Sequence, residues 1–274
     1  MPLLLHISDT HFGTCAPPIV DALIAFTAFQ KPDALVLSGD ITQRALTSQF
    51  AAARAFVDAL NLPIFLSVPG NHDIPLYHLA ARVFNPYGRY RRFFGHDLEP
   101  VINTPDLLIL GVNTTRRYRH KHGAVSLAQT ERVARRLALA DAGQLRIIVT
   151  HQPARVVHVQ DERNSLRGGA TAAQIWADAG ADLLLGGHAH LPYILEVPAG
   201  AGVGGASPGS MHCLQAGTAL SSRVRGGDPN SVNLVRWHKR VACEPHSCTA
   251  ERWDYDASCG YFQLVKATPL SLHR

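Results

Sequence analysis

The chain has 274 residues, 46% of them apolar, which is enough to bury the core of one large domain. Its formal net charge of +5 suits an anionic substrate but does not by itself indicate nucleic acid. No apolar run approaches the roughly 20 residues of a membrane span, and the N-terminus lacks a signal-peptide pattern. We therefore expect a cytoplasmic protein with neither a membrane nor a nucleic acid as partner, and the sequence is compatible with a homo-oligomer.

Five short apolar runs recur along the chain, and each ends at residues of a metal-binding type. The runs span residues 3–8, 34–39, 64–70, 145–150 and 182–187, and they lead in turn to Asp9 and His11, to Asp40, to Asn71, His72 and Asp73, to His151, and to His188 and His190. Continuous apolar runs bounded by Gly, Pro or polar turns predict strands buried on both faces. Because ligands bind at the carboxyl ends of such strands, we expect these side chains at one rim.

Helical patterns separate the predicted strands. The expected helices are Val20–Gln30, Thr47–Leu60 with Thr47 or Ser48 as cap, Leu127–Ala140 capped by Ser126, and a helix through Ala179 capped by Thr171. Strand–helix alternation through residue 190 predicts parallel βαβ units and an α/β fold.

After residue 190 the pattern changes to strands without helices. The predicted strands are Tyr193–Val197, Met211–Gln215, Ser231–Trp237 and Gly260–Val265. We expect them to form hairpins that complete a second sheet, with a long flexible hairpin tip at 198–210 and another surface hairpin at 239–258. The interpretation is one domain, residues 1–274, with a motif-bearing part (1–195) and a mainly β part (196–274).

Five cysteines, scattered and odd in number, argue against a disulfide framework. The segment from Cys243 to Cys248 could belong to a zinc site, but it has no second ligand pair at conventional spacing, so a hairpin loop is favoured.

The residues that follow the five runs suit two divalent metals. A two-metal hydrolytic centre needs a carboxylate that bridges cations about 3.5–4 Å apart. Asp40, alone after a glycine at a strand end, is the natural bridge. Asp9 and His11 are close enough in sequence to reach one ion, and His188 and His190 have the same spacing. Each motif alone is common in ordinary turns. All five in this order, each at the end of a predicted strand, argue against that interpretation.

The ordered motifs resemble those of the calcineurin-like metallophosphoesterases: Asp-x-His, Gly-Asp, Gly-Asn-His-Asp, His and Gly-His-x-His. The resemblance implies a four-layer α/β/β/α sandwich of two mixed sheets. It also implies two metal sites, one made of Asp9, His11, Asp40 and His190, and the other made of Asp40, Asn71, His151 and His188. The chain is most similar to the class III cyclic-nucleotide phosphodiesterase branch. The ligand types accommodate Mn, Fe, Zn or Co.

Two such cations would acidify a shared water, and the metal-bound hydroxide would attack phosphorus without a side-chain nucleophile. His72 is the best candidate for the acid that protonates the leaving alkoxide. The alternative is that His72 only positions the phosphate. Asp73 is expected to orient His72 or its turn.

The predicted substrate is a small phosphodiester, of the cyclic-nucleotide or glycerophosphodiester type. Arg116, Tyr118 and Arg223 are candidate substrate-binding residues, although a solvated surface position is an equal alternative for the arginines. A phosphomonoesterase with the same centre is the nearest rival function, and a nuclease is a weaker one. A non-enzymatic scaffold is disfavoured because every ligand position is filled.

Overall fold

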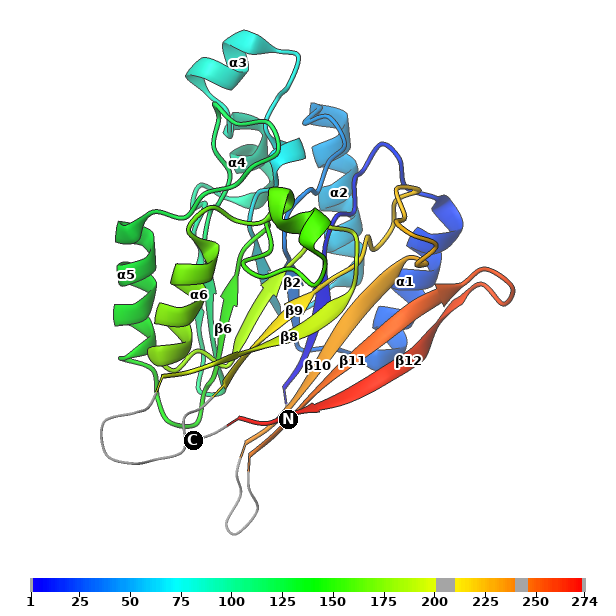
Figure 1. The fold of residues 1–274 in the computed structure, drawn as a ribbon. Helices are drawn as coiled ribbons and strands as arrows, with labels where there is room; N and C mark the ends of the chain where they lie inside the picture. Colours follow the sequence, from blue (N-terminus) through cyan, green and yellow to red (C-terminus); the bar gives the residue numbers. More distant parts are fainter. Residues whose placement is uncertain (1, 201–209, 240–245, 273–274) are drawn as a thin grey trace.

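Two mixed six-stranded sheets pack face to face in the computed structural model, which describes residues 2–200, 210–239 and 246–272 (Figure 1). The first sheet has the order β12 (Tyr261–Leu270), β11 (Ser247–Asp256), β10 (Ser231–His238), β1 (Leu3–Ile7), β2 (Ala34–Leu37) and β3 (Ile64–Ser67). The second has the order β4 (Val101–Asn103), β5 (Leu107–Gly111), β6 (Leu145–Val149), β7 (Leu183–Gly186), β9 (Ser210–Gln215) and β8 (Tyr193–Pro198).

Helices cover the outer face of each sheet. The helical elements are α1 (Pro17–Gln30), α2 (Thr47–Leu60), α3 (Leu79–Phe84), α4 (Gly88–Phe94), α5 (Leu127–Leu137) and α6 (Gly169–Asp178), with short 3₁₀ turns η1 (Asn71–Asp73) and η2 (Val159–Asn164). Helices α1 and α2 lie on the first sheet and α5 and α6 on the second (Figure 1). The four-layer α/β/β/α arrangement predicted from the sequence is confirmed.

Three apolar cores hold the layers together. Between the sheets, Leu4 and Val36 of the first pack with Ile147 and Leu185 of the second. The next residue along a strand points to the opposite face. Leu5, which follows Leu4, therefore packs in a second core with side chains of α1 and α2. This use of both strand faces explains why the strands read as unbroken apolar runs.

Parallel pairing brings the ends of the predicted motif strands to one edge of the sandwich. Strand β1 pairs in parallel with β2, and β2 with β3. In the second sheet β5, β6 and β7 are likewise parallel neighbours. The carboxyl ends of all these strands therefore lie at the end of the molecule opposite the N-terminus (Figure 1).

The late strands differ from the expectation in their sheet assignment. Only β8 and β9 extend the second sheet, whereas β10, β11 and β12 extend the first. Strand β10 pairs antiparallel with β1 at the edge that β2 leaves open. The stretch 239–258, expected to be a separate surface hairpin, instead contributes Ser247–Asp256 as strand β11, which pairs antiparallel with β10 and with β12 inside the first sheet. Residues 201–209 and 240–245, including Cys243, lie outside the described residues.

Two expected helix caps are also wrong. Helix α2 begins after Leu46, and the side-chain oxygen of Gln49 accepts backbone N–H groups near its start, so Thr47 is already helical. Helix α6 begins at Gly169, because Gly168 adopts a left-handed φ of 76° that starts the helix ahead of Thr171. The Ser126 cap of α5 is confirmed, since its hydroxyl accepts the N–H of Gln129 at 3.2 Å. No described helix is long and apolar enough to cross a membrane.

Candidate metal centre

The structure brings the seven predicted metal ligands to one rim of the sandwich. Asp9 and His11 follow β1, Asp40 follows β2, Asn71 begins η1 after β3, His151 follows β6, and His188 and His190 follow β7. Six of them, all except Asn71, form two groups within each of which the ligand atoms lie within 4.8 Å of one another, and a third such group, made of His11, Asp40 and His72, links the two.

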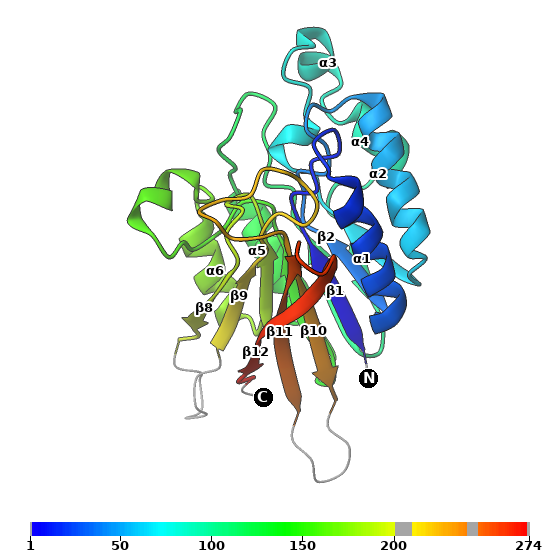
Figure 2. The same cartoon turned by 90° about the vertical axis from the view of Figure 1, so that its right-hand side faces the viewer.

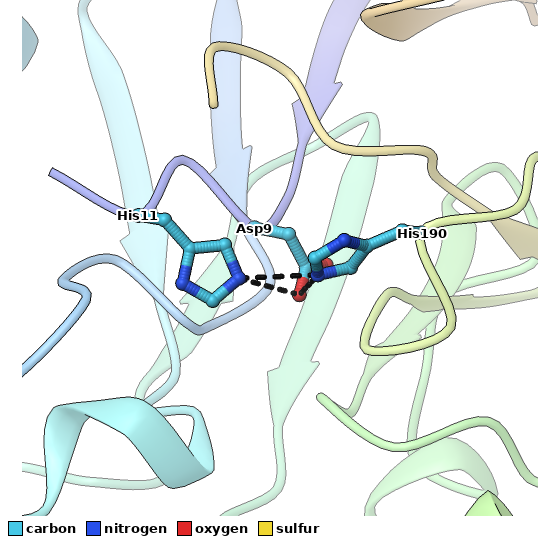
Figure 3. A group of neighbouring side chains, drawn as sticks. All are labelled: Asp9, His11 and His190. Atoms are coloured by element: carbon cyan, nitrogen blue, oxygen red, sulfur yellow. Dashed lines mark hydrogen bonds and ion pairs between the residues drawn. The ribbon is translucent and has the colours of Figure 1, made fainter. Parts of the chain in front are cut away.

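The first group joins the ends of β1 and β7 (Figure 3). Oδ1 of Asp9 lies 3.2 Å from Nε2 of His190 and 3.7 Å from Nε2 of His11. The two histidine Nε2 atoms are 3.1 Å apart. Two imidazole nitrogens and a carboxylate oxygen therefore converge on one point, as the ligands of one cation do.

The second group consists of Asp40, His151 and His188. Oδ1 of Asp40 lies 3.2 Å from Nε2 of His151, and the rings of His151 and His188 are 5.1 Å apart. The other oxygen of Asp40, Oδ2, lies 3.8 Å from Nε2 of His11 in the first group. The Asp40 carboxylate thus stands between the two groups, where a bridging ligand is needed.

Tight turns after the strands aim these side chains. Eight described residues other than glycine have a positive φ, and five of them are predicted ligands: Asp9, His11, Asp40, His188 and His190. Non-glycine residues rarely adopt this conformation, and such strain is concentrated at functional sites. The chain therefore holds unfavourable backbone geometry at the positions that form the two groups.

Two glycines of the motifs are required because atoms of the neighbouring turns lie too close to leave room for a side chain. A Cβ at Gly70 would lie 2.0 Å from the backbone nitrogen of Asp40, and one at Gly187 would lie 1.9 Å from the Ser8 hydroxyl. Both contacts are far inside normal packing distance. The glycines thus let the turns after β3 and β7 pack directly against those after β2 and β1.

The donors present fit divalent cations. Asn71 Oδ1 and His188 Nδ1 are buried, and neither has a hydrogen-bond partner among the described residues. Buried polar atoms without partners are costly, and a metal ion would satisfy both. Backbone N–H groups fix the carboxylates: His188 donates to Asp9 Oδ2 at 2.8 Å, and His72 donates to Asp40 Oδ1 at 2.8 Å.

The protonation states of His11, His188, Asp9 and Asp40 also suit metal binding. Burial lowers the pKa of His11 to about 4 and that of His188 to about 3, so both rings are neutral near pH 7. The neighbouring histidines outweigh burial and hold the pKa values of Asp9 and Asp40 below their ordinary range. Neutral imidazoles and ionised carboxylates are the forms that coordinate cations.

His72 lies at the mouth of the site. Its ring is 4.9 Å from that of His11, and its Nδ1 lies 3.0 Å from the carbonyl oxygen of Gln43. Nη1 of Arg223 donates to Nε2 of His72 at 3.2 Å. The Gln43 contact fixes a proton on Nδ1, so Nε2 is the acceptor of the Arg223 hydrogen bond, and a substrate at this nitrogen would have to displace Arg223.

Asp73 holds the turn that carries His72. Its carboxylate accepts the backbone N–H groups of Gly70, Ile41 and Thr42 and also the Thr42 hydroxyl. Burial and the charge of Asp40 raise the pKa of Asp73 to about 7, while the three backbone donors oppose that shift. Asp73 therefore ties η1 to the turn after β2, the positioning role that the sequence predicts.

A cavity of about 510 Å³ opens above the two groups. Its lining includes Asp40, Asn71, His72, His188, His190, Lys121, Asp161, Arg163, Arg223 and Arg225. Of the three predicted substrate-binding residues, the structure brings only Arg223 to this cavity. Arg116 turns aside to Gln129, 2.8 Å from its Oε1, and the Tyr118 ring is 73% exposed beside Arg119.

Asp161 and Arg163 are lining residues that the sequence did not single out. Asp161 is buried and receives both hydrogen bonds of Arg225 Nη2, at 2.8 and 2.9 Å. The same arginine donates to the carbonyl oxygen of Ala189, between the two histidines of the last motif. No spacing rule connects residues 64 positions apart, so nothing in the sequence signalled this pair.

The fold and the two His/Asp groups define a phosphoesterase with a metal-binding site. Residues 2–192 match the calcineurin-like phosphoesterase family, and the chain belongs to that family.

A curated relative is the glycerophosphodiester phosphodiesterase GpdQ of Enterobacter lignolyticus (strain SCF1), 39% identical over 82 residues. That match covers 26% of this chain and only 29% of the relative's length.

Solved structures share the fold. A purple acid phosphatase from yellow lupin matches with a TM-score of 0.65 and 14% identity over 98% of this chain and 53% of its own. A dimetal phosphatase from Danio rerio matches with a TM-score of 0.63 and 11% identity over 99% of both chains.

Proposed function

We propose that this protein is a binuclear-metal phosphodiesterase that hydrolyses small phosphodiesters. The observation that carries the proposal is the position of Asp40, whose two oxygens face two separate ligand groups beneath one cavity. When bound, two cations would supply Lewis acidity toward the phosphoryl oxygens and a hydroxide nucleophile at neutral pH. The short match to GpdQ, whose name describes a diesterase, supports the choice of diester over monoester.

The side chains around the cavity have separate roles in this proposal. His72 lines the cavity and, as a doubly protonated ring whose Nε2 is no longer occupied by Arg223, would give its Nε2 proton to the leaving alkoxide and return to the neutral form with its proton on Nδ1. The Arg223 guanidinium, 3.2 Å from Nε2 of His72, would hold a non-bridging phosphate oxygen. The contact of His72 Nδ1 with the Gln43 carbonyl keeps the ring aimed at the substrate.

The cavity lining favours an anionic substrate. Lys121, Arg163 and Arg223 line it, and no carboxylate in the described parts of the chain forms an ion pair with any of them. Arg225, by contrast, is neutralised by Asp161. Three uncompensated cations above a metal centre attract a phosphate ester and raise its association rate.

The test is a kinetic panel on protein stripped of metal with a chelator and then reloaded with Mn. We expect no turnover after stripping and, after reloading, faster hydrolysis of bis-p-nitrophenyl phosphate, cyclic AMP or glycerophosphodiesters than of p-nitrophenyl phosphate. A preference for the monoester would identify a phosphomonoesterase. Full turnover by protein shown to be free of metal would overturn the proposal.

A further inference from the structure

Helix α3 has its amphipathic pattern reversed. A surface helix normally turns its apolar face toward the protein, yet no residue of α3 is buried. Its one charged residue, Arg82, instead points inward and donates to the carbonyl oxygens of Pro75 at 3.1 Å and Arg119 at 2.7 Å. The apolar side chains left in solvent are Leu79 (69% exposed), Val83 (50%) and Phe84 (85%).

These side chains belong to a larger projecting unit. The loop that carries Tyr118 is joined to α3 by Arg117, whose Nη1 donates to the Val83 carbonyl oxygen at 2.7 Å. Tyr77, just before α3, is as exposed as Tyr118. We call residues 76–87 and 115–122 the apical lobe. In both orientations α3 forms the tip of the molecule, at the end opposite the termini (Figures 1 and 2).

The apical lobe is strongly basic. Its two stretches, 76–87 and 115–122, contain no aspartate or glutamate and five Lys or Arg residues: Arg82, Arg116, Arg117, Arg119 and Lys121. These five positive charges equal the formal net charge of +5 of the whole chain. In the described structure no carboxylate forms an ion pair with Arg82, Arg117, Arg119 or Lys121.

We propose that the apical lobe docks onto the surface of an anionic lipid bilayer, with the apolar side chains of α3 entering the headgroup region. Apolar and aromatic residues beside Lys and Arg form the pattern that binds such interfaces without spanning them. The tip is convex, so it suits a deformable surface better than a preformed groove. A second copy of the chain is disfavoured because two basic lobes would repel each other.

The apical lobe also reaches the metal centre. The ring of His120 lies 6.3 Å from that of His72, and Lys121 lines the cavity. Docking through the lobe would therefore bring the cavity mouth near lipid headgroups. That consequence rests on the proposed function, but docking itself does not, because it requires no turnover. The lack of a long apolar run, which led us to expect no membrane partner, does not bear on surface docking.

The test is co-sedimentation of the full chain with phosphatidylcholine vesicles, with and without phosphatidylserine. We expect binding only to the vesicles that contain phosphatidylserine, and weaker binding as salt is raised. Absence of binding to these vesicles at low salt would overturn the proposal, whatever the protein hydrolyses.

Variants distinguish vesicle binding through the apical lobe from nonspecific adsorption of exposed apolar side chains elsewhere. The double variant Leu79→Ser/Phe84→Ser should bind at least about tenfold more weakly, because two exposed apolar side chains are lost. Its turnover of a soluble diester should be unchanged. Phe29→Ser is the matched control, since Phe29 is 82% exposed on α1, and it should bind like the wild type. Equal losses in both variants, or a solution dimer that only the double variant dissociates, would contradict lipid docking.

Discussion

His151 places both of its ring nitrogens against acceptors, Nδ1 at 2.8 Å from the Ser38 carbonyl oxygen and Nε2 at 3.2 Å from Asp40 Oδ1. Burial alone would lower the pKa of His151. The Asp40 carboxylate, the charge of Asp9 and the Ser38 carbonyl together outweigh burial and raise that pKa to about 9. Without metal, the ring therefore holds a proton on each nitrogen at pH 7.

The first prediction concerns the pH dependence of metal binding. A cation can reach Nε2 of His151 only by displacing its proton, so metal affinity should rise with pH up to about 9. At pH 7, Mn binding should release protons to the buffer. Calorimetric titrations in buffers of different ionisation enthalpy measure this release, and an apparent enthalpy independent of the buffer would show that His151 is not a ligand.

The second prediction separates acid catalysis at His72 from phosphate positioning. His72→Ala should keep both metals and lose about 10²–10⁴-fold on an alkyl diester, whose leaving alkoxide needs a proton. It should lose much less on a nitrophenyl diester, because nitrophenolate leaves unaided. Equal losses on both substrates would make His72 a positioning group. Metal content must be measured in parallel, since the neighbouring Asn71 is a proposed ligand.

The third prediction concerns the ion pair of Arg225 with Asp161. Arg225→Gln should lower the free energy of unfolding by about 1–3 kcal/mol, because Asp161 would remain buried without its partner. It should also weaken metal binding, since the same loop supplies the Arg223 carbonyl oxygen that lies 2.6 Å from Nδ1 of His190.

Chemical denaturation and metal titration check both effects of Arg225→Gln. The matched control is Arg135→Gln, which breaks an exposed helix ion pair with Glu131 and should change neither property. Adding Asp161→Asn to Arg225→Gln should recover part of the lost stability. No recovery would mean that the pair does not act as a unit.

The sequence predicted the parts of the site that local rules determine. Each motif follows an apolar strand, and parallel pairing is enough to bring Asp9, Asp40 and His151 to one edge. What it could not predict depends on long-range pairing or on side-chain direction. The apolar pattern of strand β10 is compatible with either sheet, so the sequence alone could not show which sheet it joins. Arg116 and Arg223 looked equivalent in sequence, yet only Arg223 reaches the cavity.

The central claim is that Asp40 bridges two metal ions. Asp40→Ala should remove a ligand from both groups at once, so metal occupancy and nearly all hydrolysis should be lost while the fold survives. Asp58→Ala, at an exposed position on α2, is the control for the loss of a carboxylate and should keep both properties.

Electron paramagnetic resonance of protein loaded with two equivalents of Mn tests this claim most directly. We predict an exchange-coupled spectrum for the wild-type protein, because a shared carboxylate would hold the two ions about 3.5–4 Å apart. The spectrum of Asp40→Ala should lack this coupling. Two uncoupled, mononuclear Mn signals in the wild-type protein, or an unchanged coupled spectrum in Asp40→Ala, would contradict the account.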